Sequence, residues 1–187
     1  MKTNSLRFIL PAVFALVCGS VVSSFAQDAK PQEAKWLTNF KKAAEEAKAE
    51  NKAILLDFTG SDWCEWCMKM DKETLSQSAF KDYAAKNLVL VEVDFPNNKQ
   101  QTDEVKKQNE DLKTKYKASG FPTFVLVDAD GKVLGSQVGY MEGGPDAFIA
   151  LLNKWHKPEP NGKTAPASSS SGGDHSADSD FDKFFKK

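Results

Sequence analysis

Apolar and polar residues are arranged along the chain in a way that predicts alternating strands and helices. Three segments are apolar almost throughout and have the length of buried strands, namely residues 53–58, 88–95 and 121–128. The dipeptide Asp130-Gly131 follows the third segment and predicts a hairpin turn into a fourth strand over residues 132–140. These four strands are expected to form one mixed sheet.

Apolar residues at helical spacing occupy the segments around these strands. A first helix is predicted over residues 36–50, and a second from the cysteines to about Lys72, where the chain becomes polar. Others are predicted over residues 77–86, after a capping Thr102, and from Gly143-Gly144-Pro145 onward. The apolar positions that define the first and last helices are Leu37, Phe40, Ala44 and Ala47, and Phe148, Leu151, Leu152 and Trp155.

The N-terminal segment, residues 1–26, has the pattern of a secretory signal peptide. Basic residues precede an apolar run over residues 8–17, and small residues stand at the two cleavage positions before Gln27. The run is too short to span a membrane. We expect cleavage near Ala26. Lipid attachment at Cys18 is an alternative, but the bulky Val17 stands where a lipoprotein site needs a small residue.

The remaining chain is predicted to hold one domain between two polar segments. Residues 27–35 form a polar lead-in, and the domain is expected over residues 36–157. Residues 158–187 contain no Leu, Ile or Val, so they cannot bury enough apolar surface to offset the entropy of ordering. We therefore expect a disordered tail, although its three phenylalanines, Phe181, Phe184 and Phe185, could dock on a partner.

Composition argues against two classes of function for the exported chain. Without residues 1–26 it carries 23 Lys and 26 Asp plus Glu and no arginine, which argues against a dedicated nucleic-acid surface. It also keeps only two cysteines, Cys64 and Cys67, too few for a scaffold held by several disulfides. The two cysteines are therefore interpreted as a functional pair rather than as a structural disulfide.

The segment Cys64-Glu65-Trp66-Cys67 follows a predicted strand and a short turn containing Gly60. Residues three apart on a helix share a face, so the two sulfurs can bond to each other. A cysteine at a helix N-terminus has its thiolate stabilised by backbone N–H groups and the helix dipole. We expect Cys64 to be the nucleophile and Cys67 to resolve the mixed disulfide.

A zinc site is the alternative for this pair. Zinc would need two more soft or imidazole ligands, and the only histidines are His156 and His175. Both lie in polar surroundings typical of solvated side chains. The redox interpretation is therefore favoured.

The order of the predicted elements resembles the thioredoxin fold. Three segments carry the resemblance: residues 56–67 with the strand, acid and tryptophan-preceded cysteines, residues 115–124 with Phe121-Pro122, and the hairpin over 131–139. Together they span roughly residues 33–157. The first segment has one extra residue before the cysteines compared with the thioredoxin family. The sequence Gly60-Ser61-Asp62-Trp63-Cys64-Glu65-Trp66-Cys67 is similar in particular to exported bacterial thioredoxin-like oxidoreductases.

The resemblance implies a set of site residues. Pro122 would take the role of the cis-proline that faces the dithiol, and the backbone of Phe121 before it would pair with a substrate strand. Asp57 would be the buried carboxylate beneath Cys67 that accepts its proton; a solvated acid at a strand edge is the alternative. Thioredoxins usually place a lysine near this acid, and an alignment on Asp94 puts Leu90 there. Trp63 and Trp66 flank the cysteines and are expected to contact substrate, although Trp63 could equally support the fold.

The resemblance and the cysteine pair together imply thiol–disulfide exchange on envelope or secreted proteins. We expect the reducing or isomerising direction, because Glu65 and Trp66 between the cysteines do not favour a thiolate. This predicts a monomer without cofactor or metal, located in the periplasm or secreted, with an electron donor in the membrane. A copper carrier using Cys64, Cys67 and Met68 or Met70 is one alternative. A non-catalytic adaptor is another.

Overall fold

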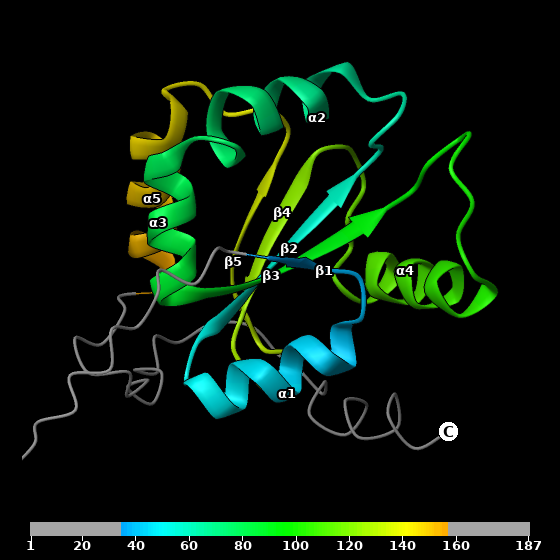
Figure 1. The fold of residues 1–187 in the computed structure, drawn as a ribbon, viewed down its shortest axis with the longest axis horizontal. Helices are drawn as coiled ribbons and strands as arrows, with labels where there is room; N and C mark the ends of the chain where they lie inside the picture. The colour runs from blue at the N-terminus through cyan, green and yellow to red at the C-terminus, as the bar shows by residue number, and fades with distance from the viewer. Residues whose placement is uncertain (1–34, 157–187) are drawn as a thin grey trace, which may run out of the picture. The chain divides into compact units, whose positions relative to one another are not determined.

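The computed structural model describes residues 35–156, which form a five-stranded sheet with helices on both faces (Figure 1). The strand order is β1-β3-β2-β4-β5. β1 (Trp36–Leu37) and β2 (Ala53–Thr59) run parallel to β3 (Leu88–Asp94). β4 (Thr123–Val127) is antiparallel to β2, and β5 (Val133–Val138) is antiparallel to β4. The predicted signal peptide, lipid site and tail lie outside the described residues, as does the lead-in before Lys35.

Two separate apolar clusters fix the helices on the two faces of the sheet. α1 (Phe40–Glu50) and α4 (Asp103–Lys115) pack on one face. The other face is covered by α2 (Glu65–Met70), the π-helical turn η1 (Asp71–Leu75), α3 (Ser78–Asn87) and α5 (Gly144–Trp155). Figure 1 shows α3 and α5 side by side, with α2 across the ends of the strands. Between Lys35 and His156, no helix is long and apolar enough to cross a membrane.

The prediction of four strands and of a helix beginning at Trp36 is wrong. Trp36 and Leu37 pair with Leu90 and Val91 at the edge of β3 and add a fifth strand. The helix begins only at Phe40, because the side chain of Asn39 accepts a hydrogen bond from the N–H of Lys42 at 2.8 Å and caps it there. Leu37 still packs on the same apolar cluster as Phe40, Ala44 and Ala47 of α1. It is apolar for that reason, and its distance along the chain from Phe40 happens to match helical spacing.

The predicted polar break at residues 72–74 is also wrong. The chain continues from α2 directly into η1, where the N–H of Ser76 donates to the carbonyl of Asp71 at 2.8 Å. Thr74 and Leu75 are buried, and Leu75 joins the apolar cluster under α3 and α5. The π turn therefore packs on the core although its sequence is mostly polar. The turn carries Asp71 and Leu75 to the underside of the cysteine helix, where both line a cavity.

Replacing Phe148 tests the core that seats α5. Its buried ring lies 4.9 Å from that of Phe124 and 5.8 Å from that of Phe80, measured between centroids. Phe148→Ala should lower the free energy of unfolding in urea by about 3–5 kcal/mol, since it leaves a cavity that this cluster cannot fill. Val138→Ala, at a residue 55% exposed on β5, is the control and should cost no more than about 1 kcal/mol. Equal losses in the two variants would contradict the packing described.

Candidate active site

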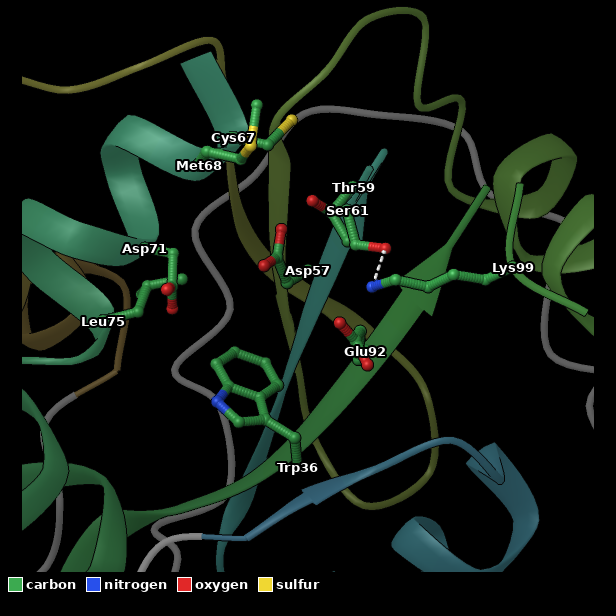
Figure 2. Close-up of a pocket in the computed structure, with 10 residues that line it drawn as sticks. All are labelled: Trp36, Asp57, Thr59, Ser61, Cys67, Met68, Asp71, Leu75, Glu92 and Lys99. Atoms are coloured by element: carbon green, nitrogen blue, oxygen red, sulfur yellow. Dashed lines mark hydrogen bonds between the residues drawn. The ribbon is translucent and has the colours of Figure 1, made fainter. Parts of the chain in front are cut away.

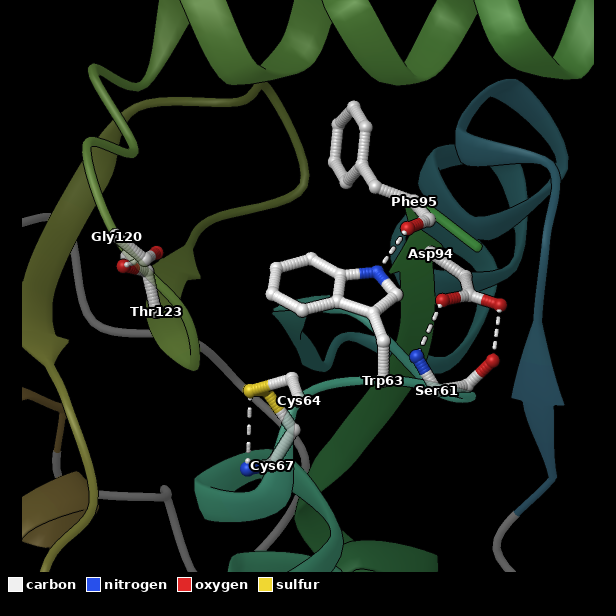
Figure 3. Close-up of a disulfide and its surroundings, with 8 residues drawn as sticks. All are labelled: Ser61, Trp63, Cys64, Cys67, Asp94, Phe95, Gly120 and Thr123. Carbon is white, nitrogen blue, oxygen red and sulfur yellow. Dashed lines mark hydrogen bonds between the residues drawn. A yellow bond between two sulfur atoms is a disulfide. The ribbon is translucent and has the colours of Figure 1, made fainter. Parts of the chain in front are cut away.

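The two cysteines form a disulfide at the start of α2. Their Cα atoms are 5.2 Å apart, and Cys64 is the N-cap residue of the helix. The sulfur of Cys64 accepts a hydrogen bond from the backbone N–H of Cys67 at 3.2 Å (Figure 3). This donor would also face a thiolate on Cys64 after reduction, when a charged acceptor strengthens the bond.

Burial does not distinguish the two cysteine residues. Cys64 is 6% exposed and Cys67 is 5% exposed. Their positions do differ, because Cys64 precedes the helix and Cys67 lies one turn inside it, above the sheet. The assignment of Cys64 as nucleophile and Cys67 as resolving thiol therefore rests on position and stays a prediction.

The turn before the cysteines is held against the end of β3 by Asp94. The backbone N–H and the hydroxyl of Ser61 donate to the Asp94 carboxylate at 2.9 and 2.6 Å (Figure 3). Asp62 reaches the following loop, where its carboxylate accepts from the N–H groups of Asn97 and Asn98 at 2.9 and 2.7 Å. These bonds lower the pKa of Asp62 because they favour its ionised form.

Trp63 completes this attachment and also contributes surface. Its indole N–H donates to the carbonyl of Phe95 at 2.7 Å, and its ring meets that of Phe121 edge to face with 5.6 Å between centroids. The residue is nevertheless 42% exposed. Both interpretations of Trp63 thus have a structural basis, since it anchors the turn and presents a ring beside Cys64.

The position of the Trp63 ring leaves no room for a side chain at Gly60. A Cβ atom at residue 60 would lie 2.4 Å from the Trp63 ring, closer than any ordinary contact. The ring cannot easily move away, because Phe95 and Phe121 fix it on its other sides.

The aromatic residues around the disulfide form two groups. Phe121 lies between Trp63 and Phe95, with 5.4 Å between the centroids of Phe121 and Phe95. Trp66 is 55% exposed and lies 5.5 Å from Tyr140, measured between ring centroids. Apolar surface therefore flanks the helix N-terminus on two sides.

The segment that carries Pro122 faces the disulfide. The Phe121–Pro122 peptide bond is cis, as the resemblance implies. The carbonyl of Pro122 accepts from the N–H of Gly139 at 2.7 Å, and the hydroxyl of Thr123 donates to the carbonyl of Gly120 at 2.7 Å. Figure 3 shows Gly120 and Thr123 on the loop opposite the cysteines.

Asp57 lies on the central strand β2 beneath Cys67 and is 8% exposed, so the alternative of a solvated acid at a strand edge is wrong. Its Oδ1 atom is buried without a hydrogen-bond partner in the protein. Burial raises the pKa of Asp57 well above its ordinary value, and the nearby Glu92, Asp71 and Asp94 raise it further.

A cavity of about 330 Å³ connects Asp57 with Cys67 (Figure 2). Cys67 and Met68 line it from α2, Asp71 lines it from η1, and Glu92 lines it from β3. Lys99 reaches it from the loop after β3, and its ammonium donates to the hydroxyl of Ser61 at 2.7 Å. The cavity therefore places polar and charged side chains next to Cys67.

The residue opposite Asp57 is Glu92, whereas Leu90, the position that the alignment on Asp94 gives to the family's lysine, lies two residues earlier on β3. The parallel register of β2 and β3 pairs Asp57 with Glu92 and Leu55 with Leu90. Leu90 is buried in the apolar cluster under α3, whereas Glu92 is half-buried and lines the cavity. A carboxylate thus lies directly opposite Asp57, and an apolar side chain stands at the position that the resemblance assigns to a lysine.

The two methionines of the copper alternative differ in position. Met70 is fully buried in the apolar core and is not placed to bind a metal beside the cysteines. Met68 is 47% exposed and lines the cavity with Cys67. Over residues 35–156, no group of three or more His, Cys, Asp or Glu side chains is arranged to hold a metal ion.

Comparison with known proteins identifies the domain. A profile described as "Thioredoxin-like domain" matches residues 40–156. The chain belongs to the thioredoxin-like domain family. It is 44% identical over 114 residues to the disulfide bond reductase DsbH of Chlamydia pneumoniae, covering 61% of this chain and 68% of that protein. A solved structure described as a DsbH oxidoreductase superposes with a TM-score of 0.62 at 39% identity, covering 70% of this chain and 91% of that one.

A more distant similarity connects the chain to part of a larger protein. It is 30% identical over 108 residues to the thiol:disulfide interchange protein DsbD of Actinobacillus pleuropneumoniae, covering 57% of this chain and 17% of that protein. With the cysteine pair in place, these relationships make this thioredoxin-like protein a thiol–disulfide oxidoreductase.

Four polar residues of this thioredoxin-like site were not among the predicted ones: Asp71, Glu92, Asp94 and Lys99. The alternation Glu92-Val93-Asp94 at the end of an apolar strand was the available sequence pattern, since it places both acids on one face of the sheet. Asp71 and Lys99 gave no comparable pattern, because a π turn and a long loop bring them to the site.

Gly60→Ala tests the fit between the turn and Trp63. The added methyl group must displace the anchored ring, so we expect a loss of about 1–3 kcal/mol in unfolding free energy, as in other overpacked sites. We also expect slower disulfide reduction by dithiothreitol. Gly120→Ala is the matched control, because its Cβ would meet only Val138 at an ordinary 3.6 Å. A Gly60→Ala protein as stable as this control would show that Trp63 is not fixed.

Asp57→Asn tests the cost of the buried carboxyl group. The folded protein holds the Asp57 proton more tightly than the unfolded chain, whose aspartate pKa is about 3.9. The wild type should therefore lose stability relative to Asp57→Asn as the pH rises from about 4 through the folded-state pKa, after which the difference stays constant. Urea unfolding of the oxidised proteins at several pH values measures this, with Asp82→Asn on the exposed face of α3 as control. If the stability of Asp57→Asn relative to the wild type does not grow with pH, the Asp57 pKa is not raised in the folded protein.

Proposed function

We propose that the protein is a disulfide reductase of exported proteins, with Cys64 as nucleophile and Cys67 as resolving thiol. The observation that carries the proposal is the Cys64–Cys67 disulfide at the N-terminus of α2, where the Cys67 N–H donates to the Cys64 sulfur. The relative with 44% identity is named a disulfide bond reductase, which supports the same direction of transfer.

In this proposal the Cys64 thiolate attacks a client disulfide and forms a mixed disulfide, while one client sulfur leaves as a thiolate. The Cys67 thiol then gives its proton to the Asp57 carboxylate and attacks the Cys64 sulfur. The second client sulfur leaves, and the Cys64–Cys67 disulfide forms. Two electrons pass to the client, and Asp57 ends protonated, which agrees with its raised pKa in the disulfide form.

The charges around the disulfide support the reducing direction. A strong oxidant needs a well-stabilised thiolate, which makes its reduced form favourable. Here Asp57, Glu92 and Asp71 gather behind Cys67 and disfavour added negative charge. The ammonium of Lys69 lies 5.2 Å from the Trp66 ring centroid and 4.5 Å from that of Tyr140, so its charge faces aromatic rings.

The exposed aromatic residues provide a surface for the client. Trp63 and Trp66 are large, partly exposed rings on either side of Cys64, and Phe121 continues this surface to the Pro122 loop. An unfolded or loosely folded client would lay apolar residues on these rings and pair its backbone with that of Phe121.

The proposal includes a location and an electron source. The pattern of residues 1–26 supports export to the periplasm or beyond, where the protein would act as a monomer. A reductase in that compartment needs electrons from the cytoplasm, so a membrane protein that passes them outward is the expected donor.

Reduction of a model disulfide protein tests this function. The reduced wild type should reduce insulin catalytically, Cys64→Ser should be inactive, and Cys67→Ser should accumulate as a mixed disulfide with its client. Equilibration with glutathione buffers should give a potential near the thioredoxin value of about −270 mV. A value above about −150 mV would overturn the reductase proposal. A reduced wild type that leaves insulin intact would instead favour the adaptor alternative.

A further inference from the structure

Two acidic side chains from neighbouring strands meet beneath Cys67. Asp57 on β2 and Glu92 on β3 are direct partners in the parallel register, and neighbouring strands lie about 4.8 Å apart. Both residues are on the face of the sheet that α2 and η1 cover, and both line the cavity that Cys67 enters (Figure 2). Their carboxyl groups therefore share one small space with the resolving sulfur.

The two carboxyl groups differ in access to solvent and cations. Asp57 is deeply buried and its Oδ1 atom has no protein partner. Glu92 is half-buried and lies nearer Lys99 at the edge of the cavity. Lys99 moderates the rise in the pKa of Glu92, which comes first from burial and then from Asp94. A proton entering this pair is therefore held by Asp57, while Glu92 keeps its charge.

The other acids near Asp57 are engaged elsewhere. Both carboxylate oxygens of Asp94 accept hydrogen bonds from Ser61, and the Asp71 carboxylate accepts one from the hydroxyl of Ser76 at 3.2 Å. Glu92 is the acid placed directly opposite Asp57 by the register. Among the neighbouring acids it also makes the largest contribution to the raised pKa of Asp57.

We propose that Glu92 is a positioning residue for proton transfer at Cys67: its carboxylate keeps Asp57 protonated in the disulfide form, so that Asp57 donates a proton to the Cys67 sulfur when a reductant opens the disulfide. This inference rests on the thiol–disulfide exchange proposed above. A cation at this position would do the opposite, because it would stabilise an ionised aspartate.

The step balances in atoms and charge. A donor thiolate attacks the Cys64 sulfur and forms a mixed disulfide, and the Cys64–Cys67 bond breaks with its electron pair on Cys67. That sulfur takes the proton from the Asp57 carboxyl group and becomes a neutral thiol. One negative charge enters on the donor sulfur and one remains on Asp57. The buried thiolate that would otherwise form beside Glu92 and Asp71 is avoided.

Two measurements on the full-length oxidised protein test the proposal. The first follows the Asp57 carboxyl carbon by NMR across pH. Its titration midpoint should fall in Glu92→Gln and fall further in Glu92→Lys, whereas Glu92→Asp should keep it near that of the wild type. Glu110→Gln, on an exposed position of α4, is the control for removing a distant negative charge.

The second measurement is the rate at which dithiothreitol opens the disulfide. Between the Asp57 midpoints of Glu92→Gln and wild type, only the wild type still holds the proton. General acid catalysis typically contributes about 10²–10⁴-fold, so Glu92→Gln should open at least about tenfold more slowly there. At lower pH, where Asp57 is protonated in both proteins, their rates should be equal.

Three outcomes would overturn the proposal. They are an Asp57 midpoint unchanged in Glu92→Gln, a lowered midpoint with no slower opening, and a slower opening that is the same at every pH. Should Glu92→Gln not fold, Lys99→Gln decides the question, because removing the cation should move the titration of the pair to higher pH; an unmoved titration refutes the coupling. Dithiothreitol opens the disulfide whatever the natural direction of exchange, so failure to reduce insulin would refute the reductase function without affecting this result.

Discussion

The attachment of the turn before the cysteines to the end of β3 is the constraint on which the site depends. Asp94 receives both donors of Ser61, Asp62 receives two backbone N–H groups of the next loop, and the indole of Trp63 donates to Phe95. Because β3 pairs with the central strand β2 over its whole length, this attachment fixes the start of α2 relative to that strand. It thereby sets the height of Cys67 above Asp57, and it permits no side chain at Gly60.

β3 and the residue after it place apolar side chains on one side of the disulfide and an acidic side chain on the other. On the outer side, Phe95, the residue after the end of β3, helps to hold Trp63 and Phe121, which form apolar surface beside Cys64. On the inner side, Glu92 faces Asp57 in a cavity that Cys67 enters. Apolar surface therefore lies on the side of Cys64, whereas acidic side chains gather on the side of Cys67. In the proposed reaction, the first side would contact the client and the second would transfer the proton.

Lysine side chains near the site are directed mainly to aromatic rings and to the edge of the cavity. Lys69 lies over Trp66 and Tyr140, and Lys113 lies 4.9 Å from the Phe95 ring centroid and 5.4 Å from that of Phe121. Lys99 binds Ser61 and moderates Glu92. This distribution leaves the buried acids under the disulfide with little compensation, which is consistent with a protein that gives electrons away more readily than it takes them.

The sequence by itself determined the main strands, the helix that begins at the cysteines, the hairpin at Asp130-Gly131 and the identity of the redox pair. Each of these depends on local periodicity, turn residues or spacing within a few positions. Tertiary structure alone decided that Trp36 and Leu37 form a strand, since they need the edge of β3 for their hydrogen bonds. It also decided that Glu92 is the residue that faces Asp57. A shift of two residues between parallel strands leaves every side chain on the same face, so the apolar pattern is compatible with more than one register, and only the packed sheet distinguishes them.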